Sequence, residues 1–451
     1  MVKTVTEASI IGPLPTGAQS KTVILVPYAV DLLPLYGYEQ TEFLVEGTSQ
    51  GHPYCTRLLV RHPREMKRFN GRALMEVSHI WGGTSAWRAY HRELMRKGYI
   101  WFELDSQAPS ALDLIKGADP VRYERMTFLP GELARDFAAS IPFTENPTPE
   151  VLAAEYDRFK ERWWRATPQS FDIIAQVAAA VRHGLPGIQR SAVKTLAFAG
   201  ISQTGGVVRR FITDYHNSAR LPGGSGVFDL YLPGASGGAA LPDIDAKVIE
   251  ILGEAEFQSV RWPCGVSGQT RGLAHRREDS DSFRLYEIAG MAHRETRRMS
   301  EKDKIRLKDC PLPDGAKWST FPNTHLYNAI LDLGFRWVER GCPPPPSQFL
   351  KTVGGTDEIC RDDHGNALGG LRTPMTDVPI STFVAATPTG RPSWYHGNET
   401  PFSAEKLLNL YGDKNSYREA FGDSLLVLLE QGFLLPEDAE ELRLEAAELS
   451  F

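Results

Sequence analysis

Cysteine is scarce in this chain, and the few cysteines show no paired spacing. Among 451 residues there are five, at positions 55, 264, 310, 342 and 360, and none forms a Cys-x-x-Cys pair. An odd number of cysteines without paired spacing argues against a disulfide framework and against a zinc knuckle. We therefore expect neither a disulfide-stabilised fold nor a metal site.

Long runs of one charge and long apolar runs are also missing. The formal net charge is −6, and the arginine pairs at 276–277 and 297–298 are short and interrupted by acids. These features predict no nucleic-acid partner and no anionic membrane surface. No run approaches the roughly 18 apolar residues of a membrane span. The first residues lack the basic and apolar segments of a signal peptide, so we expect a cytoplasmic protein.

The chain is nevertheless rich enough in apolar residues to build a large core. Hydrophobic residues make up 42% of the sequence. A chain of this length is compatible with one large domain carrying insertions, or with two to three domains.

The stretch around Ser202 organises the chain. Residues 195–199 are apolar and are bounded by Gly200, as expected of a strand buried on both faces. Apolar residues then recur at helical spacing through 207–215, so the period changes from strand to helix across Ser202. A serine on a sharp turn between strand and helix is typical of the nucleophile elbow of α/β-hydrolases. The alternative is a serine in an ordinary βα loop.

The elbow departs from the usual Gly-x-Ser-x-Gly pattern, because Thr204 stands at the last position. Two literal matches occur elsewhere, around Ser49 and Ser236. Ser49 lies between two strand-like runs, which indicates a β-turn, and no helical pattern follows Ser236. Only Ser202 has strand, turn and helix in order, so we expect it to be the nucleophile.

The residues before the elbow predict a mixed sheet. Strand-like runs at 22–27, 42–46 and 55–61 are separated by turn residues and suggest an antiparallel start. A strand at 72–78, a helix at 88–97 and a strand at 99–105 have the spacing of a βαβ crossover, which requires a parallel pair.

The loop after residue 78 is the expected source of an oxyanion donor. It contains His79, Gly82 and Gly83, where a backbone N–H can approach a substrate without side-chain interference. The backbone N–H of Gln203 would be the second donor. A plain glycine turn is the alternative interpretation of this loop.

The acid and the base of a catalytic triad have candidates in the second half of the chain. A strand at 247–252 ends in a segment with Glu254 and Glu256, and a strand at 283–288 leads to His293. The order serine, acid, histidine is that of α/β-hydrolases and differs from that of other serine enzymes. We expect Ser202 and His293 to form a triad with Glu256 or Glu254 as its acid.

The remaining segments predict additions to this core. We expect residues 1–107 and 168–310 to form the α/β-hydrolase core, a mostly parallel sheet flanked by helices. Residues 108–167 would be a cap insertion with a helix at 149–164, or a peripheral excursion. Residues 311–451 would form a C-terminal helical extension packed on the core, with helices at 325–340, at 403–410 and after 413.

Several stretches together resemble the α/β-hydrolase domain-containing proteins of the "domain 10" type, over nearly the full length of the chain. The stretches that carry the resemblance are residues 37–47, 56–61, 68–71, 82–83, 116–123, 200–203, 253–256, 284–293 and 365–374. The family accepts a small hydroxyl residue at the position of Thr204. Glu256 stands where the family usually has aspartate, and His79 where it commonly has asparagine. Residues 128–164 are longer than the family suggests, which would enlarge the cap.

The resemblance implies hydrolysis at a carbonyl carbon, with Ser202 as nucleophile and His293 as base. We expect a carboxylic ester or lactone substrate and no cofactor. Aromatic side chains such as Trp81 and Trp87 would suit a bulky apolar substrate, or belong to the core. Arg372 would be structural or face the substrate. The alternatives are an amidase or acyltransferase with the same triad, and a non-catalytic protein that binds a small molecule.

Overall fold

The computed structural model describes residues 3–17, 20–25, 27–80, 83, 86–129, 169–257, 272–297, 299, 304–305, 307–308, 310, 312–386, 396–449 and 451. The predicted helix at 149–164, and the predicted cap beyond residue 129, lie outside these residues. The chain divides into two compact units. The first comprises Met1–Pro233, Leu241–Lys247 and Cys264–Val266, and the second comprises Gly234–Ala240, Val248–Pro263 and Ser267–Phe451. Among the described residues, no helix has both the length and the apolar character that a membrane crossing requires.

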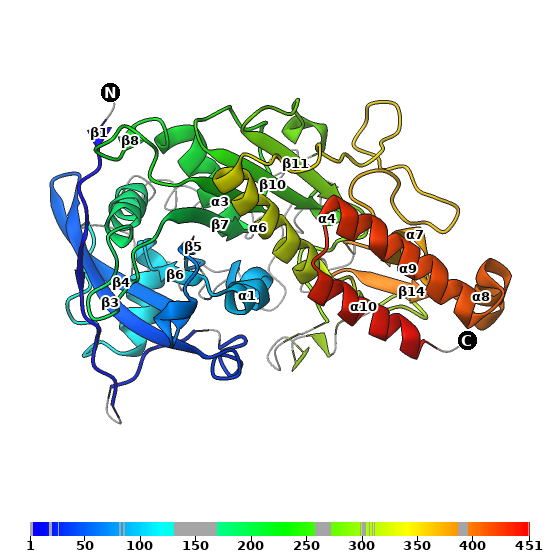
Figure 1. The fold of residues 1–451 in the computed structure, drawn as a ribbon, viewed down its shortest axis with the longest axis horizontal. Coiled ribbons are helices and arrows are strands. Elements are labelled where there is room, and N and C mark those ends of the chain that lie inside the picture. Colours follow the sequence, from blue (N-terminus) through cyan, green and yellow to red (C-terminus); the bar gives the residue numbers. More distant parts are fainter. Residues whose placement is uncertain are drawn as a thin grey trace, which may run out of the picture. The chain divides into compact units, whose positions relative to one another are not determined.

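The first unit is built on a mixed sheet whose strands are neighbours in the order β9-β7-β5-β6-β4-β3-β2. β5 is parallel to both β6 and β7, whereas β4 pairs antiparallel with β6 and β3. Figure 1 shows β3 and β4, in blue, as a long hairpin. The predicted βαβ crossover is therefore confirmed, as is the antiparallel pairing of the runs at 42–46 and 55–61. The strands of this sheet are β2 (Ser9–Ile11), β3 (Tyr38–Ser49), β4 (His52–Pro63), β5 (Arg72–Val77), β6 (Ile100–Leu104), β7 (Thr195–Ile201) and β9 (Leu230–Gly234). A separate parallel pair is formed by β1 (Lys3–Thr4) and β8 (Ala219–Arg220).

The helices of the first unit lie at its crossovers. α1 (Ala86–Lys97) joins β5 to β6, and α3 (Gln203–Arg210) follows β7 and continues as a π-helix over Phe211–Tyr215. Residues 169–181 are also helical. Short helical turns occur at Met66–Arg68 and Ser110–Lys116.

An aromatic cluster fills the core of the first unit behind β7. Phe198 of β7 stacks on Phe228 with ring centroids 4.8 Å apart, and Phe211 meets Phe198 edge-on. Phe171 and Tyr231 complete the cluster, and all five side chains are buried. Aromatic rings bury large areas and pack in defined orientations, so the strand that leads to the predicted nucleophile is tightly packed.

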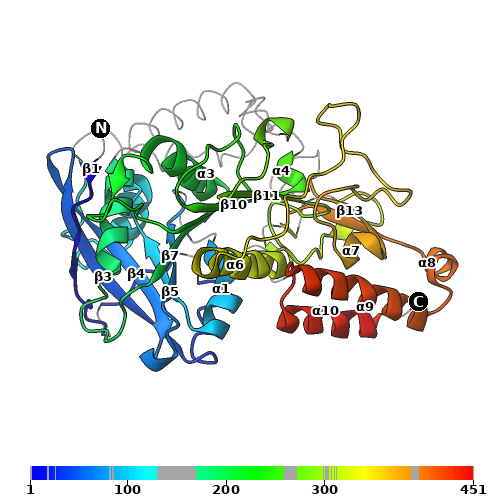
Figure 2. The ribbon, with the colours of Figure 1, turned by 45° about the horizontal axis from the view of Figure 1, so that its top comes forward.

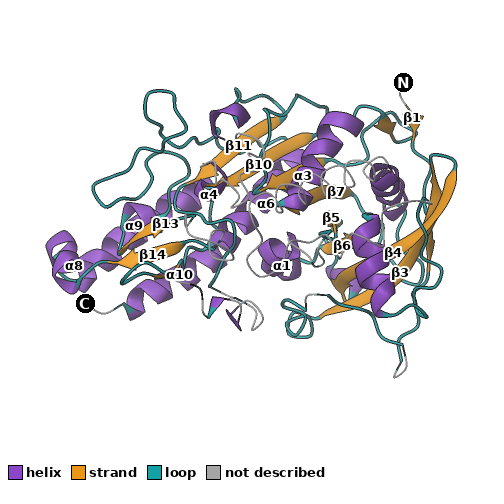
Figure 3. Ribbon diagram, turned by 180° about the vertical axis from the view of Figure 1, so that it is seen from behind, coloured by secondary structure: helices purple, strands orange, loops and turns teal. Residues whose placement is uncertain are grey.

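The second unit combines a parallel strand pair, a small antiparallel sheet and a group of helices. β10 and β11 are parallel (Figure 3), and the small sheet has the order β12-β14-β13. Figures 1 and 2 show α9 and α10, in red, side by side. The strands are β10 (Lys247–Gly253), β11 (Phe283–Ile288), β12 (Lys317–Trp318), β13 (Ser381–Val384) and β14 (Asn398–Pro401). The helices are α4 (Glu254–Phe257), a 3₁₀ turn at Gly272–His275, α6 (Asn323–Arg340), α7 (Pro374–Asp377), α8 (Ala404–Tyr411), α9 (Lys414–Gln431) and α10 (Pro436–Glu448).

Two expectations for the elements need correction. Residues 22–25 form no strand, because their backbone groups bond to side chains: Val23 N–H donates to Tyr123 Oη, and Val23 O accepts from Arg57. The segment after residue 310 is not helical throughout, since it also contains the three-stranded sheet β12-β14-β13.

Candidate active site

Ser202 occupies a strained turn between β7 and α3. Its backbone angles are φ 63° and ψ −124°, a region that residues other than glycine seldom adopt. The strand before it is buried, and α3 begins at the next residue. Strand, strained serine and helix in immediate succession are the geometry of a nucleophile elbow, which projects a serine hydroxyl beyond the end of the sheet.

The structure explains why Thr204 can replace the last glycine of the usual Gly-x-Ser-x-Gly pattern. The hydroxyl of buried Thr204 accepts from Ile201 N–H and donates to Ile201 O, both at 2.9 Å, and thereby closes the turn. The residue that must stay small is Gly200, where an added Cβ would lie 2.3 Å from Thr204 O. Strand and helix therefore approach closely at Gly200, and a threonine at position 204 supports the turn that a glycine would only permit.

The two literal Gly-x-Ser-x-Gly matches lie in other surroundings, as the sequence predicts. Ser49 ends β3, and Gln50 and Gly51 both have positive φ in the two-residue turn of the β3–β4 hairpin. Its hydroxyl donates to Asp172. Ser236 follows β9 and is buried, and no helix follows it among residues 237–246.

The loop after β5 brings one backbone N–H toward the elbow. His79 N–H donates to Gly83 O at 3.0 Å, within the loop itself. Ile80 N–H instead points to the side chain of Gln203 and lies 3.4 Å from its Oε1. Trp81 and Gly82 lie outside the described residues. The residue types predicted His79, Gly82 and Gly83 but did not single out Ile80, because backbone direction in a loop leaves no signal in the residue types.

The second unit contains a histidine–carboxylate pair. His293 Nδ1 and Glu256 Oε1 are 2.6 Å apart. The other carboxylate oxygen of Glu256 accepts from Gly253 N–H at 2.8 Å, so both oxygens are held. With its proton on Nδ1, the imidazole carries its lone pair on Nε2, the form that a general base requires.

The alternative acid, Glu254, has different partners. Its carboxylate accepts from Gly290 N–H at 2.8 Å and forms an ion pair with Arg361 at 2.6 Å. Gly290 has φ 79° and turns the chain toward His293. The two neighbouring carboxylates thus have different partners. Glu256 bonds to the histidine ring, and Glu254 bonds to the loop that carries the histidine.

Two residues considered for a substrate pocket have structural contacts. Trp87 is fully buried, donates its indole N–H to Tyr28 O, and packs against Arg61 and Trp101. Arg372 forms ion pairs with Asp362 and Asp377, and it also donates to two backbone carbonyls. These contacts favour the core position for Trp87 and the structural role for Arg372.

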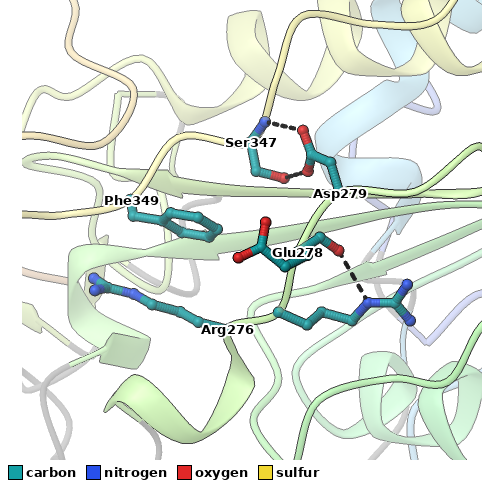
Figure 4. A pocket seen from close by; sticks show the side chains of 6 residues that line it. Arg276, Glu278, Asp279, Ser347 and Phe349 are labelled. Carbon is teal, nitrogen blue, oxygen red and sulfur yellow. Dashed lines mark hydrogen bonds between the residues drawn. The ribbon is translucent and has the colours of Figure 1, made fainter.

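An open cavity of about 430 Å³ in the second unit carries little chemistry of its own. It is lined by Arg276, Arg277, Glu278, Asp279, Ser347 and Phe349 (Figure 4). Ser347 bonds to Asp279, Arg277 donates to Glu278 O, and Arg276 makes a two-bond ion pair with Glu287. None of the six lining residues is one of the predicted catalytic residues.

One cluster of the second unit has side chains of the metal-ligand type. His325 of α6 and Asp438 and Glu441 of α10 offer ligand atoms within 4.8 Å of one another. Asp438 accepts from Asn328, and Glu441 lies 3.4 Å from Arg297 and 3.7 Å from His325. Because Asn328 and Arg297 already bond to the two carboxylates, we interpret the cluster as a polar network that joins α6 and α10.

The three residues predicted to form a triad therefore lie in two local arrangements. Ser202 at its elbow belongs to the first unit, and the His293–Glu256 pair belongs to the second. The structure brings the predicted base and acid together within their unit, and it gives the predicted nucleophile the backbone of an elbow.

Comparison with solved structures finds esterases and a dienelactone hydrolase at low identity and low TM-score. A dienelactone hydrolase of Anabaena variabilis is 13% identical with a TM-score of 0.24, over 48% of this chain and 74% of that one. A fungal esterase of Rhizomucor miehei is 12% identical with a TM-score of 0.24, over 45% of each chain. The cell wall degrading esterase LipA of Xanthomonas oryzae is 12% identical with a TM-score of 0.22, over 44% of this chain and 42% of that one.

A comparison with curated protein sequences found no match. The model of the α/β-hydrolase domain family, by contrast, matches residues 10–443, which include the elbow, the loop after β5 and the His293–Glu256 pair. The chain therefore belongs to this α/β-hydrolase family.

Proposed function

We propose that this chain is a serine hydrolase that cleaves a carboxylic ester or lactone through an acyl-enzyme on Ser202. The observation that carries the proposal is the strained backbone of Ser202 between β7 and α3. A non-glycine residue keeps such a conformation only where the surrounding structure enforces it, and such positions cluster at active sites. The His293–Glu256 pair, which follows in the chain order of α/β-hydrolases, supports the same conclusion.

In the proposed mechanism, Ser202 Oγ attacks the carbonyl carbon and its proton moves to His293 Nε2. Glu256 keeps the proton of the ring on Nδ1 and stabilises the imidazolium. The tetrahedral intermediate collapses, and the leaving alkoxide takes the proton from His293. Water then attacks the acyl carbon with His293 again acting as base, which releases the acid and restores Ser202.

The oxyanion would be bound by backbone N–H groups of the first unit. Gln203 is the first residue of α3, where N–H groups have no partner within the helix. Ile80 N–H is the second donor that we propose, in addition to the predicted loop residues His79, Gly82 and Gly83. Its 3.4 Å contact with Gln203 Oε1 is long for a hydrogen bond, so an oxyanion could replace it. Each donor contributes on the order of 3 kcal/mol to stabilising the transition state.

The test is intact mass after incubation with a fluorophosphonate, for wild type, Ser202→Ala and Ser236→Ala. We expect one adduct on wild type and on Ser236→Ala, and none on Ser202→Ala. Ser236 is the matched control, because it lies in a literal Gly-x-Ser-x-Gly motif but lacks the following helix. A folded wild-type protein that takes no adduct would contradict the proposal and favour a non-catalytic binding protein.

Substrate panels then separate the reactions that share this machinery. Ester or lactone turnover with water as acceptor supports the proposal. Amide cleavage, or transfer of the acyl group to an added alcohol in preference to water, would instead assign an amidase or an acyltransferase with the same nucleophile.

A further inference from the structure

Two glutamine side chains join three loops of the first unit at the carboxyl ends of β5, β6 and β7. Gln107 follows β6, and Gln203 begins α3 directly after Ser202. Gln107 Nε2 donates to Ser78 O at 2.8 Å and to Gln203 Oε1 at 3.2 Å. Gln203 Nε2 donates back to Gln107 Oε1 at 2.8 Å. One side chain after β6 therefore ties the loop after β5 to the elbow after β7.

The hydrogen bonds fix the orientation of the Gln107 amide. Both of its N–H groups point to acceptors, and its oxygen faces a donor. The reversed amide would place its oxygen against Ser78 O and Gln203 Oε1, two acceptors. Gln107 is also only 3% exposed, so water cannot easily replace a lost partner.

The Gln107–Gln203 pair includes one of the two residues whose backbone N–H groups we propose as oxyanion donors, and it contacts the other. Gln203 is one of them, and its Oε1 also accepts from Ile80 N–H at 3.4 Å. Ser78, whose carbonyl accepts from Gln107, lies two residues before Ile80 and donates its hydroxyl to Asp105 at 2.5 Å. Oxyanion donors act only when they are already aimed at the developing charge, so small displacements of these loops reduce the rate.

We propose that Gln107 is a positioning residue, which sets the spacing of the Gln203 and Ile80 N–H groups through its paired amide with Gln203. This inference rests on the proposed hydrolase function. Gln107 does not touch the reacting atoms, and its effect passes through Gln203 and the loop after β5. Its loss should therefore slow the chemical step and leave the binding of the reagent almost unchanged.

The experiment measures the maximal rate of fluorophosphonate labelling of Ser202 and the half-saturating reagent concentration, for wild type, Gln107→Met, Gln203→Met and the double variant. Methionine keeps the length of the side chain and removes its hydrogen bonds. Gln176→Met is the matched control, because Gln176 is also a buried glutamine of the first unit. It donates to Thr48 O and accepts from Tyr54 Oη, away from the elbow.

We expect Gln107→Met to lower the maximal labelling rate about 10-fold at an unchanged half-saturating concentration. The double variant should be hardly slower than Gln107→Met, because both substitutions break one pair. Gln176→Met should lower the melting temperature and leave the rate unchanged. If Gln107→Met does not fold, Gln203→Met alone tests the pair, because it removes the same two bonds and keeps its backbone N–H.

A lower melting temperature with an unchanged labelling rate in Gln107→Met and Gln203→Met would overturn the inference and leave Gln107 a structural residue. Additive effects in the double variant would also overturn it. Failure of the proposed function is distinguishable, because wild type itself would then take no adduct, or its adduct would persist in Ser202→Ala.

Discussion

Ser202, Thr204 and Gly200 illustrate how single residues determine the elbow. The serine accepts an unfavourable backbone conformation, the threonine hydroxyl bonds to both backbone groups of Ile201, and the glycine allows α3 to approach β7. In the pattern Gly-x-Ser-x-Gly, a glycine at the last position allows the sharp turn. Here the hydroxyl of Thr204 at that position stabilises the turn through its hydrogen bonds to Ile201.

The clearest prediction at the residue scale compares the two neighbouring glutamates. Glu256→Gln should lower the rate of ester hydrolysis about 10²-fold to 10⁴-fold, because an amide cannot stabilise the imidazolium and can favour the wrong tautomer of His293. Glu254→Gln should retain most activity and lower the free energy of unfolding by about 1–3 kcal/mol, because it loses its ion pair with Arg361.

Steady-state kinetics and urea unfolding of both variants check this assignment. Equal losses of activity at equal stability would mean that the carboxylates do not have separate roles. A larger loss of activity in Glu254→Gln would make it the acid.

At the scale of elements, the connection from β5 to α1 depends on a buried carboxyl group. Glu76 of β5 accepts from Ala86 N–H and Trp87 N–H at the start of α1, and from the indole N–H of Trp101. These bonds close the loop that contains His79 and Ile80. Burial, reinforced by the carboxylate of Glu103, outweighs the three donors and raises the pKa of Glu76 to about 8.

This raised pKa predicts a pH dependence of stability. Between about pH 5 and pH 8 the folded state keeps the proton of Glu76 while the unfolded chain has released it. The free energy of unfolding should therefore fall as pH rises through this range, by an amount on the order of 1–3 kcal/mol. Below this range both states hold the proton, and above it neither does.

Urea unfolding at several pH values, for wild type and Glu76→Gln, measures the effect. The variant should be less stable than wild type at pH 5, because its amide N–H groups face a donor, and its stability should change less with pH. Equal slopes for the two proteins would show that Glu76 titrates at its ordinary value.

The elements that the sequence predicts well are those whose partners are close in the chain or whose pattern is strong. The strand at 283–288 and the strand–turn–helix around Ser202 are examples. The prediction of a strand at 22–27 is wrong, because side chains distant in the sequence, Arg57 and Tyr123, bond to the backbone of Val23. The short strands β12 and β14 pair across about 80 residues, and local periodicity contains no information about such partners.

At the scale of the whole molecule, the chain passes between its two units more than once. Residues 241–247 belong to the first unit, although residues of the second unit precede and follow them. Within the first unit, Asp245 contacts His216 and Arg220, both at 2.6 Å. Neither unit is therefore one continuous piece of chain.

This connectivity predicts cooperative unfolding of both units. We expect amide protons of β5 and β6 and those of β10 and β11 to lose protection at the same urea concentration, because one unit cannot unfold without straining chain segments of the other. Hydrogen exchange followed by mass spectrometry along a urea series tests this expectation. Two separate midpoints would indicate that the units are independent domains.

The sequence by itself indicated the fold class and the order of the expected chemical groups, because periodicity and small-residue turns are local properties, and its resemblance to known sequences indicated the family. Only the tertiary structure assigned Glu256 to His293 and Glu254 to Arg361, since these contacts depend on how loops far apart in the chain are folded. It alone also revealed the Gln107–Gln203 pair and the direction of Ile80 N–H. A hydrogen bond between residues about 100 positions apart leaves no periodic trace, and the direction of a backbone N–H is set by dihedral angles that residue types do not fix.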